Sequence, residues 1–409
     1  MTLREKFTVP KRYNMVAMAL MAIGILAIIG LYVTHGSSSD EHERSRFWAS
    51  LLQNSVFFLL VVNAAMFFIA VTTLAWGGWQ LSFSRVSEAV SACVPVMSVI
   101  TLAILLSIVF GGDHAIYHWT DTEHVKQDYI LNFKKGFLNK GFFAAVSVIT
   151  VALWSFLGWK MRQRSRQLDT NPLPSVEAAK KYMWNGTVWS ALYLVVFALT
   201  VMSSIPWLWL MSIDAHWYST MYSWYTFAST WVSGIALIAL FVVFLKNNNY
   251  LELTNEEHLH DIGKFMFAFS VFWTYLWFSQ FMLIWYANIP EETTYFAPRA
   301  KGIYKGIFWM MFIINFLAPL LILMRRGSKR NYTTMTFMSM LIIFGHWLDF
   351  FQMVHPGPSP DHVPMLLYDF CVALGFVGLI MYVTGRALSK VPLIPRNHPF
   401  LKESVIHHT

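Results

Sequence analysis

Long apolar stretches recur along the whole chain, and they constrain the fold more than any other feature of the sequence. Each has about twenty residues or more with few charges, which is enough for a helix to cross the roughly 30 Å hydrocarbon core of a bilayer. Composition agrees, because 56% of the 409 residues are apolar and 13% are charged, whereas about a quarter of an ordinary soluble domain is charged. The sequence therefore predicts an all-α integral membrane protein without a soluble domain.

Hydropathy predicts ten transmembrane helices in one membrane domain that covers residues 1–409. The first follows Lys11 and Arg12 and is too long for the core of a signal peptide, so we interpret it as a retained anchor. Lys and Arg are concentrated in the two tails and the even-numbered connections, which predicts that both termini are cytoplasmic. The net charge of +8 follows from this topology and predicts no nucleic-acid partner. The predicted spans are 14–35, 48–76, 86–110, 141–160, 183–205, 217–245, 265–288, 303–324, 332–354 and 363–385.

Cysteine and histidine usage argues against a resident redox centre. Cys93 and Cys371 lie singly in separate spans, so the chain has no cysteine cluster for iron–sulfur and no C-x-x-C-H motif for c-type haem. A Walker A motif and a Gly-rich dinucleotide fingerprint are also absent from the sequence. Only His346 lies well inside a span, whereas haem b needs two facing imidazoles. We therefore predict no covalently bound cofactor and no metal.

Ionisable side chains inside the ninth and tenth spans are the strongest indication of a functional site. Such groups are costly in a bilayer and usually face a bundle interior or a wet cavity. Asp369 in the tenth span lies at the depth of Asp349 in the ninth, roughly 10 Å below the outer surface by helical rise. We expect the two carboxylates to form a coupled pair. The polar residues of the ninth span, at steps of three, are His346, Asp349, Gln352 and His355.

Two further polar residues lie deep in neighbouring spans. Gln280 in the seventh span is about 12 Å below the outer surface by the same helical rise, and Asn315 in the eighth is deeper. Two interpretations stay open. Both residues line the same buried cluster, or they make structural hydrogen bonds between helices, each contributing about 1 kcal/mol or less.

Two local patterns occur near the predicted cytoplasmic ends of the spans. Arg85 and Glu88, three residues apart, predict an ion pair at the start of the third span. Residues 255–263 predict a short capped helix ahead of the seventh span, with Asn255 as its N-cap and Gly263 as its stop.

Histidine and acidic side chains gather in the connections that are predicted to face away from the cytoplasm. Imidazole titrates near neutral pH, so this face is a solvated rim, a docking face for another protein, or the mouth of a proton route. His114 and His118 are four residues apart, but no convincing third ligand accompanies them, so they do not predict a zinc site. The candidate docking residues are His114, His118, His216, Glu291 and Glu292.

Two stretches of the sequence point to a known family: "MSIDAHWYSTMYSWYTFAS" (211–229) and "DIGKFMFAFSVFWTYLWFSQFMLIWYANIPEETTYF" (261–296). They closely resemble the smaller NrfD-type (polysulfide-reductase-like) membrane subunit of bacterial alternative complex III, a quinol:cytochrome c oxidoreductase. In span count and topology the resemblance extends over nearly the whole chain. It implies ten helices, arranged as two four-helix bundles with two flanking helices, in the bacterial inner membrane.

The same resemblance implies partners and a role. The partners are a larger NrfD-type membrane subunit, periplasmic multihaem cytochrome c and iron–sulfur subunits, other subunits of the complex, and a terminal oxidase as a further associate. Those partners hold the redox centres. This chain is then expected to scaffold the complex, surrounded by structural lipids, and to conduct protons or bind menaquinol near the periplasmic surface. From the buried polar residues described above, we predict that the proton path or quinol site comprises His346, Asp349, Gln352, His355, Asp369 and Gln280.

The alternative is a standalone secondary transporter or proton channel with a site between helix bundles. Transporters of that kind commonly have a pair of Gly- or Pro-broken helices at the site. The sequence shows no obvious pair of this kind, which favours the subunit interpretation.

Overall fold

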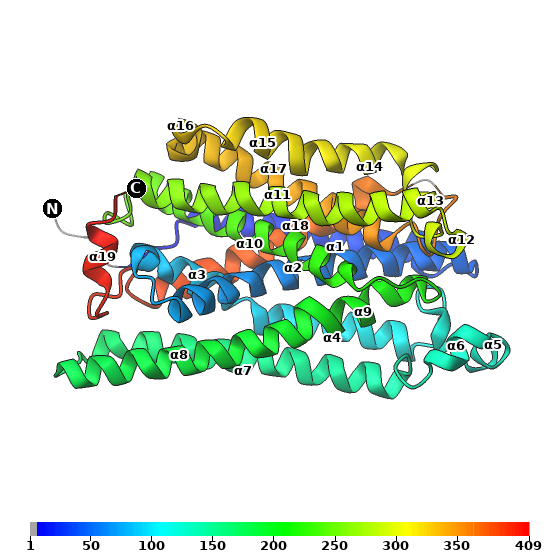
Figure 1. Ribbon diagram of the computed structural model, residues 1–409, viewed down its shortest axis with the longest axis horizontal. Helices are drawn as coiled ribbons and strands as arrows, with labels where there is room; N and C mark the ends of the chain where they lie inside the picture. The colour runs from blue at the N-terminus through cyan, green and yellow to red at the C-terminus, as the bar shows by residue number, and fades with distance from the viewer. Residues whose placement is uncertain (1–5, 363, 409) are drawn as a thin grey trace.

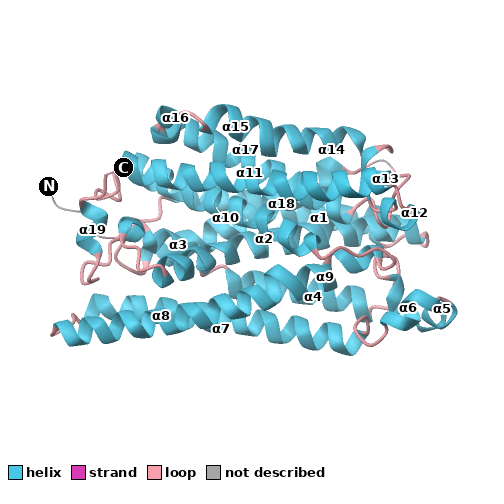
Figure 2. Cartoon of the chain, in the orientation of Figure 1, coloured by secondary structure: helices cyan, strands magenta, loops and turns pink. Residues whose placement is uncertain are grey.

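All ten predicted spans are helices in the computed structural model, which describes residues 6–362 and 364–408 (Figure 1). These ranges contain no strand (Figure 2). Each of the ten is long and apolar enough to cross a membrane, which confirms an all-α multi-pass protein. The spans are α1 with η1 (Lys11–Gly36), α2 (Glu41–Leu74), α3 and α4 (Ser84–Ser91 and Val94–Phe110), α7 (Lys140–Thr170), α8, η4 and α9 (Val176–Leu199, Thr200–Ser204 and Ile205–Trp209), α10 (Met221–Asn247), α11 (Glu256–Ala287), α14, η6 and α15 (Lys305–Phe312, Ile313–Leu317 and Ala318–Leu323), α17 (Tyr332–Val354) and α18 (Leu366–Ser389).

The described part of the chain begins and ends at the same end of the bundle, which we call the inner end (Figure 1). Short helices cover the opposite, outer end, and others cover the inner end. The outer helices are η3 (His118–Thr120), α5 (Thr122–Gln127), α6 (Tyr129–Lys134), η5 (Met211–Asp214), α12 (Pro290–Thr293) and α13 (Phe296–Ala300), and the inner helices are η2 (Trp79–Ser82), α16 (Arg326–Arg330) and α19 (Leu401–Val405).

Two closed rings of four spans form the body of the molecule. In the first ring, α2 packs against α4 and α8, and α7 packs against the same two helices. In the second ring, α10 packs against α11 and α17, while the eighth span closes the ring because α15 contacts α11 and α14 contacts α17. Helices α2 and α10 join the rings, and α1 pairs with α18 beside them. The chain thus has two four-helix bundles and two flanking helices.

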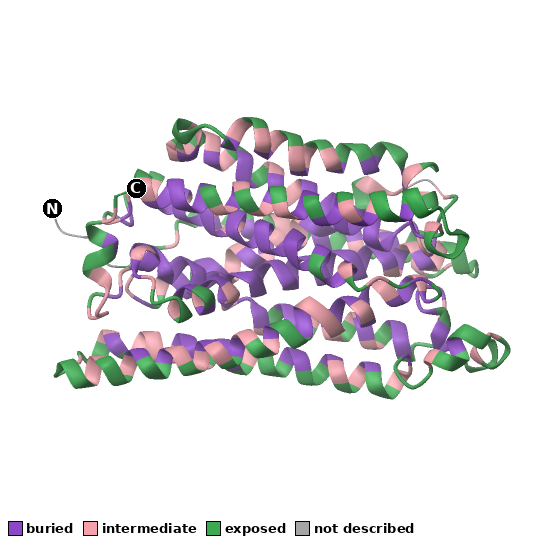
Figure 3. Ribbon diagram, viewed as in Figure 1, coloured by how far each residue is buried: buried purple, intermediate pink, exposed green. Residues whose placement is uncertain are grey.

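The core follows α2, α10 and α17 through the middle of the bundle (Figure 3). In the most apolar window of α10, 83% of residues are buried, against 22% in that of α1. Large side chains exposed on the peripheral spans are mostly apolar, for example Leu26, Phe156 and Leu321. Many exposed apolar side chains on the outside of a helix bundle are typical of helices that contact lipid tails.

Small residues bring α1 and α18 into close contact. A Cβ atom built on Gly24 would lie 2.4 Å from the Cα of Gly375, and one built on Gly378 would lie 2.6 Å from the carbonyl oxygen of Ala17. In lipid, where apolar side chains gain little by leaving the solvent, close backbone contact is a main source of helix association. The flanking pair therefore depends on these glycines.

Three spans contain an irregular turn, which the sequence analysis did not anticipate. The third span breaks between α3 and α4, and the fifth and eighth each contain a π-helical turn, η4 and η6. Pro95, Pro206 and Pro319 follow the three interruptions within a few residues. Proline lacks the amide hydrogen that the preceding turn would bond, so it favours an irregular turn at these places.

The seventh span starts at the predicted cap but does not stop at the predicted glycine. Asn255 accepts hydrogen bonds from the backbone N–H groups of Glu257 and His258, which confirms it as the N-cap. Helix α11 then continues through Gly263 to Ala287. A Cβ on Gly263 would lie 2.8 Å from Cγ of Lys329, so this glycine permits close packing against α16 and does not end a helix.

The C-terminal segment, residues 395–408, crosses the inner ends of both bundles. Asn397 Nδ2 donates to the carbonyl oxygen of Leu168 on α7, 2.6 Å away. Ser404 Oγ donates to the carbonyl oxygen of Trp79 at 2.6 Å. The His407 imidazole lies 2.6 Å from the Asp261 carboxylate on α11. The segment thus ties the first bundle to the second.

Candidate functional site

Asp349 lies at the centre of a buried polar cluster between α10, α11 and α17. Its carboxylate accepts hydrogen bonds from the Tyr225 hydroxyl and, at 2.8 Å, from Trp273 Nε1. His346 Nδ1 lies 3.8 Å from Asp349 Oδ2 and 3.0 Å from Ser229 Oγ. All five side chains are buried. We call them the Asp349 cluster.

The Asp349 cluster combines a carboxylate and an imidazole with neutral hydroxyl and indole donors. An acid and a histidine within a few ångströms of each other form an arrangement that can take up and pass on a proton. His346 Nε2 is buried without a hydrogen-bond partner among the described residues. The cluster therefore has both an ionisable pair and a free imidazole nitrogen inside the membrane.

Asp369 belongs to a second cluster, nearer the outer end. His355 Nε2 lies 3.9 Å from Asp369 Oδ1 and 3.0 Å from Gln53 Oε1 on α2. The His355 ring stacks on Phe351, with 4.0 Å between ring centroids. Gln53 Nε2 in turn donates to the carbonyl oxygen of Trp347, 3.1 Å away. We call Asp369, His355 and Gln53 the Asp369 cluster.

The two carboxylates do not form the coupled pair that their matching depth predicts. No hydrogen bond or ion pair within residues 6–362 and 364–408 joins Asp349 to Asp369. Asn54 of α2 lies between their helices, because it accepts from Trp347 Nε1 at 2.8 Å and donates to the carbonyl oxygen of Asp369 at 3.3 Å. Asp349 accepts hydrogen bonds from residues of α10 and α11, whereas Asp369 faces His355 at the end of α17. The two carboxylates therefore belong to two separate sites.

The remaining predicted polar residues lie outside both clusters. Gln352 Nε2 donates to the backbone carbonyl oxygen of Tyr304, 3.0 Å away, and the backbone carbonyl oxygen of Gln352 accepts from Arg299 Nε at 2.7 Å. These bonds give Gln352 a structural role at the outer end. Gln280 Nε2 and both amide atoms of Asn315 are buried without a partner in the described part of the chain. Asn315 lies in the π-helical turn η6 and packs against Gly345, where a Cβ would meet its Oδ1 at 2.0 Å.

The five candidate docking residues all lie in outer connections, where His118 belongs to η3 and Glu291 and Glu292 belong to α12 (Figure 1). His118, His216, Glu291 and Glu292 are exposed. His216 also pairs with Asp128 at 2.5 Å, which links two connections. In the described ranges no three His, Cys, Asp or Glu side chains come together as a metal site.

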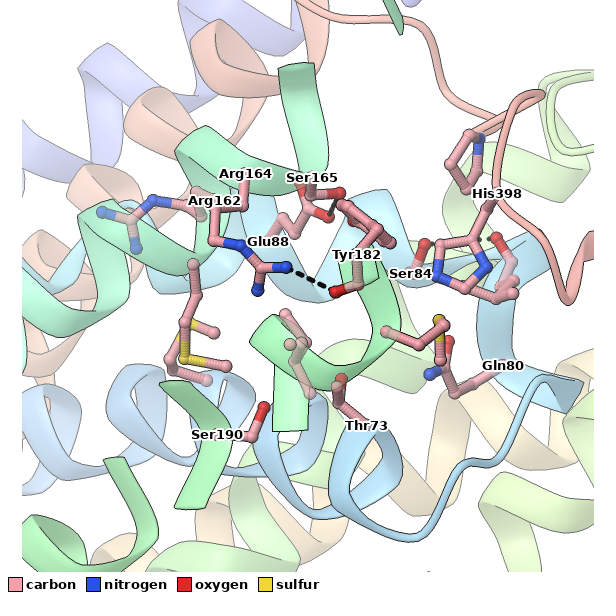
Figure 4. Close-up of a pocket in the computed structure, with 17 residues that line it drawn as sticks. Thr73, Gln80, Ser84, Glu88, Arg162, Arg164, Ser165, Tyr182, Ser190 and His398 are labelled. Carbon is pink, nitrogen blue, oxygen red and sulfur yellow. Dashed lines mark hydrogen bonds between the residues drawn. The ribbon is translucent and has the colours of Figure 1, made fainter. Parts of the chain in front are cut away.

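A polar cavity of about 70 Å³ lies at the inner end of the first bundle (Figure 4). The predicted ion pair is confirmed, with Arg85 Nη1 2.8 Å from Glu88 Oε2. The ion pair is part of a larger network than the sequence predicts. Arg85 Nη2 also binds Asp169 at 2.7 Å, and Ser165 Oγ donates to Glu88 at 2.5 Å. The sequence analysis missed Asp169, since a carboxylate in a basic segment looks like an ordinary surface residue.

His398 of the C-terminal segment lines this cavity in its neutral form. Its Nδ1 accepts a hydrogen bond from the backbone N–H of Phe400 at 3.2 Å, which requires an unprotonated nitrogen. Burial, together with the charge of Arg85, lowers the pKa of His398 to about 4.

This lowered pKa predicts a loss of stability in acid. Because the folded-state pKa lies below the ordinary value of about 6.5, the contribution of His398 is complete above that pH and is lost as the pH falls toward 4. We expect the thermal unfolding midpoint of the wild type to fall more between pH 7 and 4.5 than that of His398→Phe, which keeps a ring beside Tyr182 but cannot titrate. Parallel pH curves for the two proteins would contradict this assignment.

Three members of the Asp349 cluster escaped the sequence analysis. Tyr225 and Ser229 lie in the 211–229 stretch and Trp273 in the 261–296 stretch, the two segments that carry the family resemblance. Tyrosine, serine and tryptophan are common in membrane helices, so the residue types alone did not indicate that these three belong to a functional site. Only the position of these residues within the two stretches pointed to them.

The fold and the clusters define a multi-pass membrane protein with ionisable residues buried among its spans. Comparison with protein-family models gives no match, and comparison with curated proteins gives none either.

Proposed function

We propose that the chain is an integral membrane subunit of a quinol-oxidising respiratory complex, of the smaller NrfD-type (ActF-type) kind found in alternative complex III. The Asp349 cluster is the observation that carries this proposal. An acid and a histidine held by a tyrosine and a tryptophan inside a membrane bundle suit proton conduction or the binding of a quinol hydroxyl. The chain then scaffolds the complex in the bacterial inner membrane and takes part in its proton or quinol chemistry.

An apolar crevice in the middle of the bundle supports the binding of a lipophilic ligand such as menaquinol. It has a volume of about 400 Å³ and lies between α2, α10, α17 and α18. Trp347 lines it and donates to Asn54, which bonds the backbone of Asp369, so hydrogen bonds connect the crevice wall to the Asp369 cluster. An isoprenoid tail in the crevice would bring a quinol headgroup toward His355 and Asp369. The lining includes Phe58, Phe241, Phe344, Trp347, Phe370 and Val377.

The proposal assigns electron transfer to partner subunits, since the sequence offers no ligand motif for haem or iron–sulfur. Those partners are a larger NrfD-type subunit and periplasmic multihaem and iron–sulfur subunits, which would contact the outer connections that carry Glu291 and His216.

Purification in mild detergent tests this assignment. We expect the wild-type chain to leave its native membrane with haem-containing partners, so that the preparation absorbs in the Soret band. After separation, the isolated polypeptide is expected to show no Soret absorption and no iron above trace. Stoichiometric iron in the separated chain, or a colourless chain that purifies alone, would contradict the proposal.

The interrupted spans favour a second candidate, a standalone secondary transporter or proton channel. The third and eighth spans are each broken and followed by Pro95 or Pro319, and paired broken helices are a feature of transporter sites. A transporter is expected to purify colourless and alone, so the same experiment separates the two functions.

A further inference from the structure

One stripe of α7 changes from apolar to basic along its length. Ile149 and Phe156, seven residues apart and therefore on one face, are both more than half exposed. Trp159 follows, with its ring centroid 6.1 Å from that of Phe156. Beyond it lies a groove of about 270 Å³ lined by Trp159, Arg162, Gln163, Arg166, Gln167 and Thr170.

The change occurs where α7 leaves the hydrocarbon core. Lys160 Nζ lies 5.7 Å from the ring centroid of Trp159 and 5.9 Å from that of Trp189 on α8. Tryptophan rings with a lysine beside them are typical of the boundary between lipid tails and headgroups. At 1.5 Å per residue, the backbones of Arg162 and Arg166 lie about 4.5 and 10.5 Å beyond that of Trp159, on the headgroup side of this boundary.

The groove lining is positively charged, although Asp169 and Glu88 lie close enough to interact electrostatically with Arg166 and Arg162. Its lining contains two arginines one turn apart and no acidic residue. Asp169, three residues beyond Arg166, already has both carboxylate oxygens bonded by Arg85 Nη2, at 2.7 and 2.8 Å. Arg162 Nη1 is bonded to Ser91 of α3, whereas Arg166 Nε is buried without a hydrogen-bond partner in the described ranges.

A buried N–H donor without a partner is costly, and a guanidinium group is best satisfied by the oxygens of an anion. Gln163, Gln167 and Thr170 add neutral donors and acceptors on the same stripe. The apolar part of the stripe, at Phe156 and Ile149, offers a track for a hydrocarbon chain. A small inorganic anion would use the basic part alone, whereas a phospholipid would use the whole stripe.

We propose that this stripe of α7 binds one anionic phospholipid. The phosphodiester lies against Arg166 and Arg162, the headgroup hydroxyls bond Gln163, Gln167 and Thr170, and an acyl chain follows Phe156 and Ile149. Basic pockets at the ends of membrane helices are known to recognise anionic headgroups in this way. This site is separate from both carboxylate clusters and does not depend on the proposed respiratory role.

Native mass spectrometry of the full-length chain, in whatever assembly it purifies, tests the proposal with two added lipids. Phosphatidylglycerol and phosphatidylcholine with identical acyl chains differ only in the headgroup. We expect the wild type to retain phosphatidylglycerol about tenfold better than phosphatidylcholine, and Arg166→Gln to lose most of that preference, because the variant lacks the charge-assisted hydrogen bond. Arg166→Lys, which keeps the charge, should retain part of it.

Lys181→Gln is the matched control, because Lys181 is an exposed cation near the inner end of α8 and lies outside the groove lining. Unchanged retention of phosphatidylglycerol by this variant supports a defined site. Equal losses in Lys181→Gln and Arg166→Gln would mean diffuse attraction and overturn the proposal. Equal retention of the two lipids by the wild type, or displacement of phosphatidylglycerol by millimolar inorganic phosphate, would overturn it as well.

Discussion

Asp349→Asn is expected to leave the proposed respiratory complex assembled and to lower its quinol:cytochrome c turnover or proton release by about a hundredfold or more, the range for loss of a positioned acid or base. The amide has nearly the shape of the carboxylate, and its oxygen can still accept from Trp273 Nε1. What it loses is the ability to exchange a proton with His346, 3.8 Å away. Turnover and proton release by the purified complex in proteoliposomes measure the effect.

Stability must be measured beside activity, because Asp349 also holds three helices together. We expect the thermal unfolding midpoint of Asp349→Asn to stay within a few degrees of the wild type, since the loss of one net hydrogen bond is worth about 1 kcal/mol. Asp369→Asn tests the other cluster in the same assay. If both variants keep wild-type turnover and proton release, both clusters are structural and the site assignment fails.

Gly375→Ala is expected to destabilise the chain by about 1–3 kcal/mol, the usual cost of an added methyl group in a tightly packed contact. Its Cβ would lie 2.8 Å from the Cα of Gly24. Neither backbone can move aside locally, so α1 and α18 must separate along their length. Thermal unfolding in detergent, followed by circular dichroism, measures the loss.

Gly306→Ala on α14 is the matched control. A Cβ at that position would meet no atom within 4 Å, and replacing a helical glycine by alanine in open space is neutral or slightly stabilising. Equal destabilisation by both substitutions would show that the α1–α18 crossing has no special role.

The architecture was largely predictable because few backbone structures can cross the hydrocarbon core of a bilayer. A bilayer core requires each crossing to be a helix of about twenty apolar residues, so all ten spans followed from hydropathy. The predicted limits of the ninth, 332–354, agree with α17 as found. The fourth span was predicted too short because α7 continues as a helix to Thr170, through a basic segment that hydropathy excludes.

The candidate site was predictable only in part. Asp349, Asp369 and His346 were found because charge is expensive inside a membrane. Their partners were not, because a bond between Tyr225 and Asp349 joins residues 124 positions apart and depends on how helices rotate about their axes. Helical rise gives an approximate depth but not the direction in which a side chain points, and for that reason Asp349 and Asp369 were wrongly expected to be partners.

The placement of the C-terminal segment has a consequence for biosynthesis. Asn397, Ser404 and His407 are translated after all ten spans, yet their bonds reach α7, η2 and α11. The inner ends of the bundles can therefore be closed only after this segment has emerged from the ribosome, when every span has already been made. A nascent or prematurely terminated polypeptide would leave this end open, with His258 of α11 deprived of its contact with Ser404, and would offer quality-control proteases an exposed site that the finished protein conceals.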